Sequence, residues 1–423
     1  GANLSAFVGL NGPYRVDRNH DGDLNDEGEG PNPTAAGFDL QGVDVALALH
    51  RETAVTGGSD TPRSWLSLKA TADTATEVGI PFMTLETSAM AIGINAGSAG
   101  ENVVDLKAAK ALSVATGDGN QSISLDFDAA RGTQVKASSA FKLNIADFVT
   151  ASGTLGFERS LREVVLADGT KANTEMLTFG GENLNAFVGL NGPSDGLYNA
   201  SNQPDAVGLA LTDVDFALAL FSPRAGETAT QGLKWAAVKA TAASVQVVGM
   251  PELTVAARHL SLALNLVDTS GSTRSVNADN KVIDFAGGGG TRQLDVVTGT
   301  GRSMAIDLNG ALGQYVRASG DVQLRVGDFF EVQGSLGFER RVQDVLLADG
   351  SRVKTQLITI GGTGLEAFVG FGPYEVQQNG QTIINPQARG VKVSDVEFGL
   401  ALFTSKDAGY TDKRWTALTG SVG

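Results

Sequence analysis

The stretch from residue 17 to residue 29, DRNHDGDLNDEGE, places oxygen-bearing side chains on alternate residues. This spacing lets a tightly curled loop direct several ligands at one hard cation. Five residues fall on positions 1, 3, 5, 7 and 9 of the calcium-loop pattern, with a glycine at position 6 for the sharp turn: Asp17, Asn19, Asp21, Asp23 and Asn25. The stretch holds six acids and one arginine, a charge density that a bound cation would relieve.

The loop departs from the pattern where it should close. Position 12, which normally supplies a bidentate carboxylate, is Gly28, and the acids on either side of it are Glu27 and Glu29. We therefore predict a calcium site in which Glu27 or Glu29 completes the ligand shell. A solvated acidic turn without metal is the alternative that the sequence leaves open.

Composition excludes several classes of partner. The net charge of -15 argues against nucleic acid and anionic membranes, because both are bound through clustered Lys and Arg. Cysteine is absent, so disulfides and thiolate chemistry are unavailable. There is no apolar run of about 18 residues, so no membrane span is expected in this segment. The 54 glycines and the low aromatic content of 6% indicate β-structure with many reversals.

A long internal repeat organises the chain. The block LSAFVGLNGP at Leu4 returns as LNAFVGLNGP at Leu184 and as LEAFVGFGP at Leu365, after intervals of 180 and 181 residues. We divide the chain into repeat 1 (1–183, with the acidic loop as an insertion), repeat 2 (184–364) and a partial repeat 3 (365–423). The corresponding segments of repeats 2 and 3 lack the alternating acids, so calcium would be a local addition to the common fold.

Further blocks keep their order within each repeat. VDVALAL, VDFALAL and VEFGLAL are each followed by one of the three Trp of the chain, and the GFER and LADG blocks occur twice. We expect these Trp to pack against a sheet rather than to stack on sugars. We expect the chain to be part of a longer array of such repeats.

Within a repeat the apolar residues alternate with a period of two, as in WLSLKAT and FKLNI, which predicts half-buried strands. We expect about ten strands per repeat, joined by short reversals. The predicted fold is all-β, an elongated tandem-repeat array with a period of about 180 residues. A continuous antiparallel meander that advances ~48 Å per repeat is favoured. A β-solenoid and a row of β-sandwich beads are the alternatives.

No catalytic motif stands out, and we expect the chain not to be an enzyme. The three histidines occupy non-equivalent repeat positions, and no G-x-S-x-G elbow is present in a strand-turn-helix context. Several carboxylates recur between repeats, among them Asp44 with Asp215 and Glu158 with Glu339. Acids repeated in this way suit structural pairing better than a single active site.

The AFVGLNGP, VD[VF]ALAL and GFER...LADG blocks together resemble the giant repetitive surface or secreted adhesin-like proteins of bacteria. Residues 17–29 resemble the calcium loops of dockerins and thrombospondin-type repeats. The first resemblance implies an extracellular or cell-surface location and a structural or adhesive role. It implies no particular ligand.

The sequence therefore predicts a structural segment of a long extracellular bacterial fibre or adhesin stalk with a calcium loop in one repeat. Its expected partners are neighbouring repeats of the same long chain and other copies in a fibre. A carbohydrate- or protein-binding module, with a glycan or cell-surface ligand held by variable loops, is the alternative. A polysaccharide-degrading enzyme is the function that the residues favour least.

Overall fold

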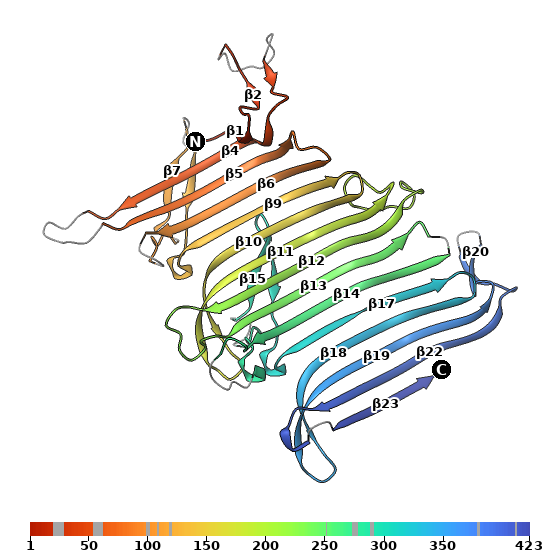
Figure 1. The fold of residues 1–423 in the computed structure, drawn as a ribbon. Helices are drawn as coiled ribbons and strands as arrows, with labels where there is room; N and C mark the ends of the chain where they lie inside the picture. Colours follow the sequence, from red (N-terminus) through yellow and green to blue (C-terminus); the bar gives the residue numbers. More distant parts are fainter. Residues whose placement is uncertain are drawn as a thin grey trace.

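The computed structural model in Figure 1 describes residues 1–19, 29–53, 62–98, 102–107, 110–117, 121–250, 252–272, 278–287, 292–378, 381–410 and 413–423. Its regular structure in these ranges consists of β-strands and a few short 3₁₀ turns, without an α-helix. The described part of the chain accordingly has no helix long and apolar enough to cross a membrane. The predicted all-β class is confirmed.

Fifteen strands form one open antiparallel sheet in which each strand pairs with the sheet strands before and after it. In spatial order they are β1 (Leu4–Leu10), β4 (Ala36–Arg51), β5 (Ser64–Val78), β6 (Met83–Gly97), β9 (Gln134–Ile145), β10 (Val149–Val165), β11 (Lys171–Leu190), β12 (Val207–Pro223), β13 (Lys234–Val248), β14 (Leu253–Asp268), β17 (Tyr315–Val326), β18 (Phe330–Leu346), β19 (Arg352–Phe371), β22 (Arg389–Ser405) and β23 (Arg414–Val422). Antiparallel pairing throughout is that of the favoured meander and not of stacked parallel coils.

Four two-stranded ladders stand outside this main sheet. Two are hairpins inserted between sheet strands, and both lie behind the sheet in Figure 1. They are β7 (Leu112–Ala115) with β8 (Ser122–Leu125), and β15 (Leu294–Gly299) with β16 (Arg302–Ile306). The other two ladders are β2 (Arg15–Val16) with β3 (Gly30–Pro31), and β20 (Glu375–Gln378) with β21 (Gln381–Ile384).

The long strands are interrupted by β-bulges at corresponding places. β1, β11 and β19 each shift register against the following sheet strand just after one leucine, and these leucines open the repeated blocks LSAFVGLNGP, LNAFVGLNGP and LEAFVGFGP. A left-handed residue precedes each leucine, with φ of 53°, 53° and 57°. These residues are Asn3, Asn183 and Gly364. Asn and Gly tolerate this conformation better than other residues, which explains their presence here.

The structure corrects our expectation that about ten strands per repeat stack in the meander, because several of them form separate hairpins. The sheet contains six strands from β4 to β11 and six from β12 to β19, with the hairpin strands additional. A bulge shifts the alternation of side chains by one residue, so a single bent strand reads as two short strands in the sequence. Six strands advance the sheet by ~29 Å per repeat, in place of ~48 Å.

The sheet is continuous where the sequence repeats meet. β11 spans residues 171–190 and therefore runs through the boundary at 183/184, and β19 spans residues 352–371 and runs through the boundary at 364/365. One half of each strand belongs to one repeat and the other half to the next. No linker separates the sequence repeats at these two points.

The two faces of the sheet differ. β13 has no register shift with either neighbour, so its alternate residues mark the faces. Trp235 and Ala237 lie on the face of the β15–β16 hairpin and are nearly inaccessible, whereas Val238 lies on the other face between Leu218 and Leu264. That second face carries many exposed large apolar side chains, among them Leu47, Leu220, Leu262, Phe338 and Leu418.

Candidate functional site

The β2–β3 ladder flanks the acidic stretch, of which residues 17–19 and 29 lie within the described part of the chain. At its base, Glu29 Oε1 accepts hydrogen bonds from the backbone N–H of Arg18 at 2.9 Å and of Asn19 at 3.1 Å. The second oxygen, Oε2, is buried and has no partner among the described residues. Nearby, Arg15 Nη2 lies 2.8 Å from Oδ2 of the buried Asp39 and ties the ladder to β4. Glu29 therefore closes the base of the loop through the backbone.

The predicted calcium ligands divide into two groups. Asp17, Asn19 and Glu29 lie within the described residues, whereas Asp21, Asp23, Asn25 and Glu27 lie outside them. The described residues contain no group of three or more His, Asp or Glu arranged to hold a metal. Calcium binding thus stays a prediction. In the predicted site, Glu29 Oε1 is bonded to the backbone, and Oε2 is the oxygen that would face the cation.

The Trp residues take a structural position. Trp235 is 2% exposed, and its Nε1 donates a hydrogen bond of 2.6 Å to the carbonyl oxygen of Lys281, in the segment that leads to the β15–β16 hairpin. Trp65 Nε1 donates in the same way to the carbonyl of Asn102, at 3.0 Å, in the segment that leads to the β7–β8 hairpin. Trp235 and Trp65 therefore each fasten an inserted segment to the sheet.

A buried asparagine accompanies each of these two Trp. Asn265 is 1% exposed and donates from Nδ2 to the carbonyl of Ile283 at 2.9 Å. Asn95, which is fully buried, donates from Nδ2 to the carbonyl of Val104 at 3.0 Å. Buried amides are rarely left without partners, so these bonds fix where the inserted backbone can lie. The same anchor is therefore built twice, once in each repeat.

The β15–β16 hairpin also reaches back over repeat 1. The carbonyl oxygen of Val297 lies so close to Gly156 in β10 and Gly180 in β11 that an added Cβ would meet it at 2.3 and 2.4 Å. Real Cβ atoms do not tolerate such distances, so only glycine permits this approach. The two glycines form a floor on which the hairpin lies.

Polar contacts hold the hairpin tip. Thr300 Oγ1 lies 3.0 Å from Ser138 Oγ in β9 and donates to a backbone carbonyl of β6 at 2.7 Å. Glu182 in β11 accepts from Thr298 Oγ1 at 3.0 Å and from Arg302 Nη1 at 3.2 Å. Every one of these acceptors and partners belongs to repeat 1, while the hairpin belongs to repeat 2.

The segment before the hairpin pairs with the turn between β10 and β11. The N–H of Ala167 donates to the carbonyl of Val282 at 2.9 Å, and the N–H of Asp284 donates to the carbonyl of Val165 at 2.9 Å. These two bonds flank an antiparallel bridge between Leu166 and Ile283. The inserted segment thus adds a short strand to an exposed edge of repeat 1.

Apolar burial joins the two repeats at the same place. The largest buried cluster combines side chains of repeat 1, of repeat 2 and of the hairpin itself. They include Val164, Leu166 and Met176 from repeat 1, Phe221 and Trp235 from repeat 2, and Leu294, Val296 and Ile306 from the hairpin. We call the contact of the hairpin and its leading segment with β9–β11 the interlock. Its geometry is suited to mechanical coupling between neighbouring repeats.

A salt bridge lies within the interlock. Lys281 Nζ is 2.7 Å from Asp168 Oδ2. Burial alone would raise the pKa of Asp168, but the Lys281 ammonium and the hydroxyl and N–H of Thr170 outweigh this effect and hold the pKa below its ordinary value. The carboxylate is therefore charged at neutral pH and stabilises the contact between the two repeats.

The recurrent carboxylates make local structural contacts. Asp44 accepts from the N–H of Asn3 and Asp215 from the N–H of Asn183, both at 2.8 Å, and each bond secures a bulge. Glu158 is buried against Arg131 Nη1 at 2.5 Å. These contacts agree with the structural pairing that the sequence predicts for them.

One serine and one histidine meet an aspartate on the exposed surface. Asp321 Oδ1 accepts from Ser335 Oγ at 2.5 Å, and Oδ2 lies 2.8 Å from His259 Nδ1. The carboxylate stands between the hydroxyl and the imidazole, so the histidine does not contact the hydroxyl that it would need to activate. The hydrogen bonds from Ser335 and His259 lower the pKa of Asp321.

Comparisons with known proteins add little. No protein-family model matches the chain. No curated protein matches it either. Among solved structures, the siderophore receptor PiuA from Acinetobacter baumannii aligns over 92% of this chain and 73% of the receptor, with 8% identity and a TM-score of 0.21. A similarity of this size carries no argument about fold or function.

The interlock was not predicted from the sequence, which read the hairpin strands as members of the meander. One signal for it exists. Asn95 and Asn265 interrupt apolar alternation at corresponding strand positions, where a buried amide demands a partner from outside the sheet. The floor glycines also fall within strands, where glycine often marks a close backbone approach.

The glycine floor yields a matched pair of substitutions. Gly156→Ala should lower the free energy of unfolding by about 1–3 kcal/mol, because the new methyl group displaces the Val297 carbonyl. Gly337→Ala, at the corresponding position of β18, should change it by less than ~0.5 kcal/mol, since nothing lies within 4 Å of an added Cβ there. Thermal melting of both variants compares them, and equal losses would contradict a floor built for the hairpin.

The salt bridge predicts a pH dependence. Because the folded pKa of Asp168 is depressed, its stabilisation is present above the unfolded pKa and is lost as pH falls through the folded value. Asp168→Asn should cost ~0.2–1 kcal/mol at neutral pH and nothing once the wild-type carboxyl is protonated. Melting curves between pH 7 and pH 2 measure this difference. In a Lys281→Met background the cost of Asp168→Asn should shrink, and an unchanged cost would place the effect elsewhere.

Proposed function

We propose that this chain is a structural segment of a long extracellular bacterial fibre or adhesin stalk, built from repeated sheet modules. The observation that carries the proposal is the continuity of the sheet across both repeat boundaries, through β11 and β19. A module that shares a strand with its neighbour forms a stiff junction instead of a flexible link. Such a design suits a part that provides length and rigidity.

The interlock supports the same function. A pulling force along the stack would have to break the ladder between β11 and β12 and also detach the hairpin from β9–β11. Neighbouring repeats are thus joined in two ways, by strand pairing and by the interlock. Repeat proteins gain their stability from such nearest-neighbour contacts, so each added module would reinforce the last.

Other copies of the fibre are the partners that we propose for the free face of the sheet. Large apolar side chains extend along this face, including Leu49 in β4 and Leu418 in β23, each 71% exposed. Contiguous apolar surface of this extent marks an interaction site. Two sheets that pack face to face lie about 10 Å apart, a geometry that would bury these rows in a lateral pair of fibres.

Calcium at residues 17–29 would stiffen one module of the fibre. The β2–β3 ladder and the two backbone bonds to Glu29 hold the ends of the loop together, which lowers the entropy lost when the loop closes on a cation. Asp17, Asn19, Asp21, Asp23 and Asn25 are the proposed ligands, with Glu27 or Glu29 completing the shell.

Location and assembly can be tested on the source organism. Immunogold electron microscopy on intact cells should place an antibody against this chain along extracellular filaments. Peptide mapping of the native polypeptide should recover many additional AFVGLNGP-type blocks. Labelling that appears only after the cells are permeabilised, or a native polypeptide of about the present length, would contradict the proposal.

The calcium site is tested by melting in excess calcium and in chelator. At a calcium concentration about 100 times Kd, binding should stabilise the folded loop by ~2.7 kcal/mol and slow protease cleavage within residues 17–29. Asp21→Asn with Asp23→Asn should abolish both effects. The control pair Asp344→Asn with Glu375→Gln removes two exposed acids elsewhere and should abolish neither. A wild-type chain indifferent to calcium would rule the site out.

A further inference from the structure

The floor that receives the β15–β16 hairpin occurs a second time in the sheet. Gly337 in β18 and Gly361 in β19 correspond to Gly156 and Gly180, and they pair directly with each other as those two do. An added Cβ meets nothing within 4 Å at Gly337 and only a backbone oxygen at 3.7 Å at Gly361. This second floor is open.

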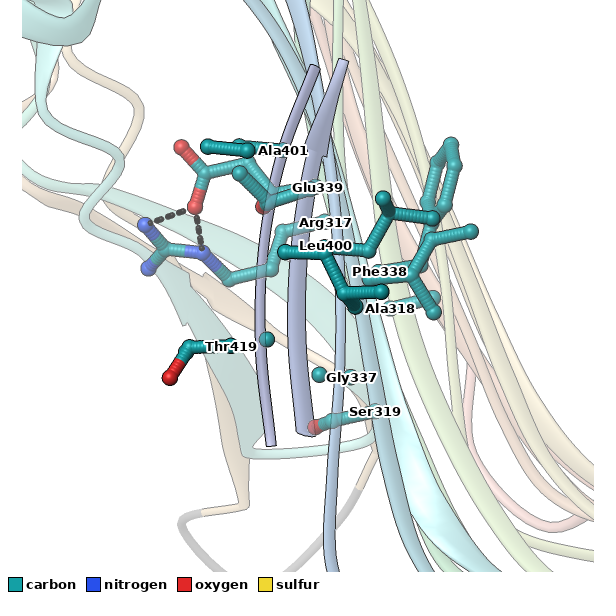
Figure 2. A pocket seen from close by; sticks show the side chains of 15 residues that line it. Arg317, Ala318, Ser319, Gly337, Phe338, Glu339, Leu400, Ala401 and Thr419 are labelled. Atoms are coloured by element: carbon teal, nitrogen blue, oxygen red, sulfur yellow. Dashed lines mark hydrogen bonds and ion pairs between the residues drawn. The ribbon is translucent and has the colours of Figure 1, made fainter. Parts of the chain in front are cut away.

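The row that crosses the open floor consists of small residues. Ser319, Gly337, Gly361, Gly399 and Thr419 lie side by side in successive strands. Figure 2 shows this part of the sheet, with the paired Arg317 and Glu339 on one side and Phe338 projecting on the other. Pairing places the glycine row on the side of Arg317 and Glu339, which is the side that carries the hairpins elsewhere.

The edge that pairs with the leading segment is also repeated and open. Leu346 corresponds to Val165 and is 65% exposed. Leu347 corresponds to Leu166, whose side chain is 1% exposed, and is only half-buried. Asp349 corresponds to Asp168, which binds Lys281 in the observed interlock. Floor and edge thus recur together, in the same relation to β18 and β19.

Burial marks the same difference on the neighbouring strands. Ala219 and Ala237 are at most 1% exposed beneath the hairpin. Of their counterparts, Ala401 is half-buried and Ala417 is exposed. Trp415, the counterpart of Trp235, is half-buried on β23. The small residues around the second floor therefore recur, and they are more exposed than their counterparts beneath the hairpin.

We propose that Gly337, Gly361 and the edge Leu346–Asp349 form an acceptor for a hairpin of the β15–β16 kind, carried by a repeat unit that continues the sheet beyond β23. Continuity with the observed interlock identifies this occupant, since the same floor and edge receive such a hairpin one repeat earlier. In the observed interlock, Glu182 accepts a hydrogen bond from Arg302 of the hairpin. Thr363 stands at the position of Glu182 in the second floor, so a hairpin that docks there needs no arginine at the position of Arg302. The inference rests on the proposed function only in assuming that such repeat units exist.

The test supplies that unit directly. Trp415 corresponds to Trp235, and therefore the last residue, Gly423, corresponds to Ala243. A copy of residues 244–364, appended after Gly423, continues the repeat in register. Cysteine is absent, which allows one reporter pair at a time. Ser138→Cys with Thr300→Cys replaces two hydroxyls 3.0 Å apart and should form a disulfide in the original chain. Ser319→Cys with Thr300→Cys in the appended copy should form the equivalent bond within one molecule.

Gly361→Leu should reduce this second disulfide at least fivefold, because the side chain occupies the floor. The same substitution should leave the melting temperature of the original chain unchanged, since the floor is open there. Gly117→Leu, at another open glycine, is the control and should leave the disulfide intact. The emission of Trp415 should also shift to shorter wavelength in the extended chain, which reports docking without any cysteine.

A chain that forms the control bond between positions 138 and 300 but not the second bond would overturn the proposal. Disulfides that form only between separate molecules would overturn it as well, because the acceptor would then not serve units in line. Neither result depends on where the native protein is located, so a failure of the fibre proposal on cells is distinguishable from a failure of the acceptor.

Discussion

The close approach of the Val297 carbonyl to the backbone of β10 and β11 is the contact on which the rest of the structure depends. It requires glycine at positions 156 and 180, and it brings the β15–β16 hairpin low enough to bury the small side chains beneath it. An open sheet of small residues has little apolar area to bury on its own. The hairpin supplies a second layer over part of the sheet. Where no hairpin covers the sheet, the hydrogen-bonded strand ladder holds the strands together.

This arrangement distributes stability differently from a globular core. The hairpin is held to its own repeat by Trp235 and Asn265 and to the preceding repeat by the floor, the edge and Glu182. Neither repeat can release it alone without exposing part of the shared cluster. We therefore expect the two repeats to unfold cooperatively at their junction, which fits a protein whose proposed task is to extend without bending. The opposite face keeps its large apolar side chains exposed.

Much of this architecture could be predicted from the sequence. Alternating runs such as VDVALAL specified half-buried strands, and the recurrence of AFVGLNGP placed repeat boundaries inside strands that proved continuous. The number of strands in the main sheet was overestimated because several strands of each repeat form separate hairpins, and because bulges, as at Asn183, shift the alternation without ending the strand. The interlock escaped prediction because Gly156 and Val297 lie far apart in sequence, and their contact depends on how the sheet is stacked. Of the acidic loop, the base at Glu29 is placed by the structure, and its cation stays a prediction.

Amide hydrogen exchange after removal of the hairpin tests the coupling between repeats most directly. In a chain whose residues 278–308 are replaced by a short Gly-Ser turn, the hairpin of repeat 2 is lost while repeat 1 keeps its entire sequence. Protection should then fall in β10 and β11, around Val164 and Met176, together with that in β12 and β13. Loss of protection confined to β12–β14, with β10 and β11 unchanged, would contradict it.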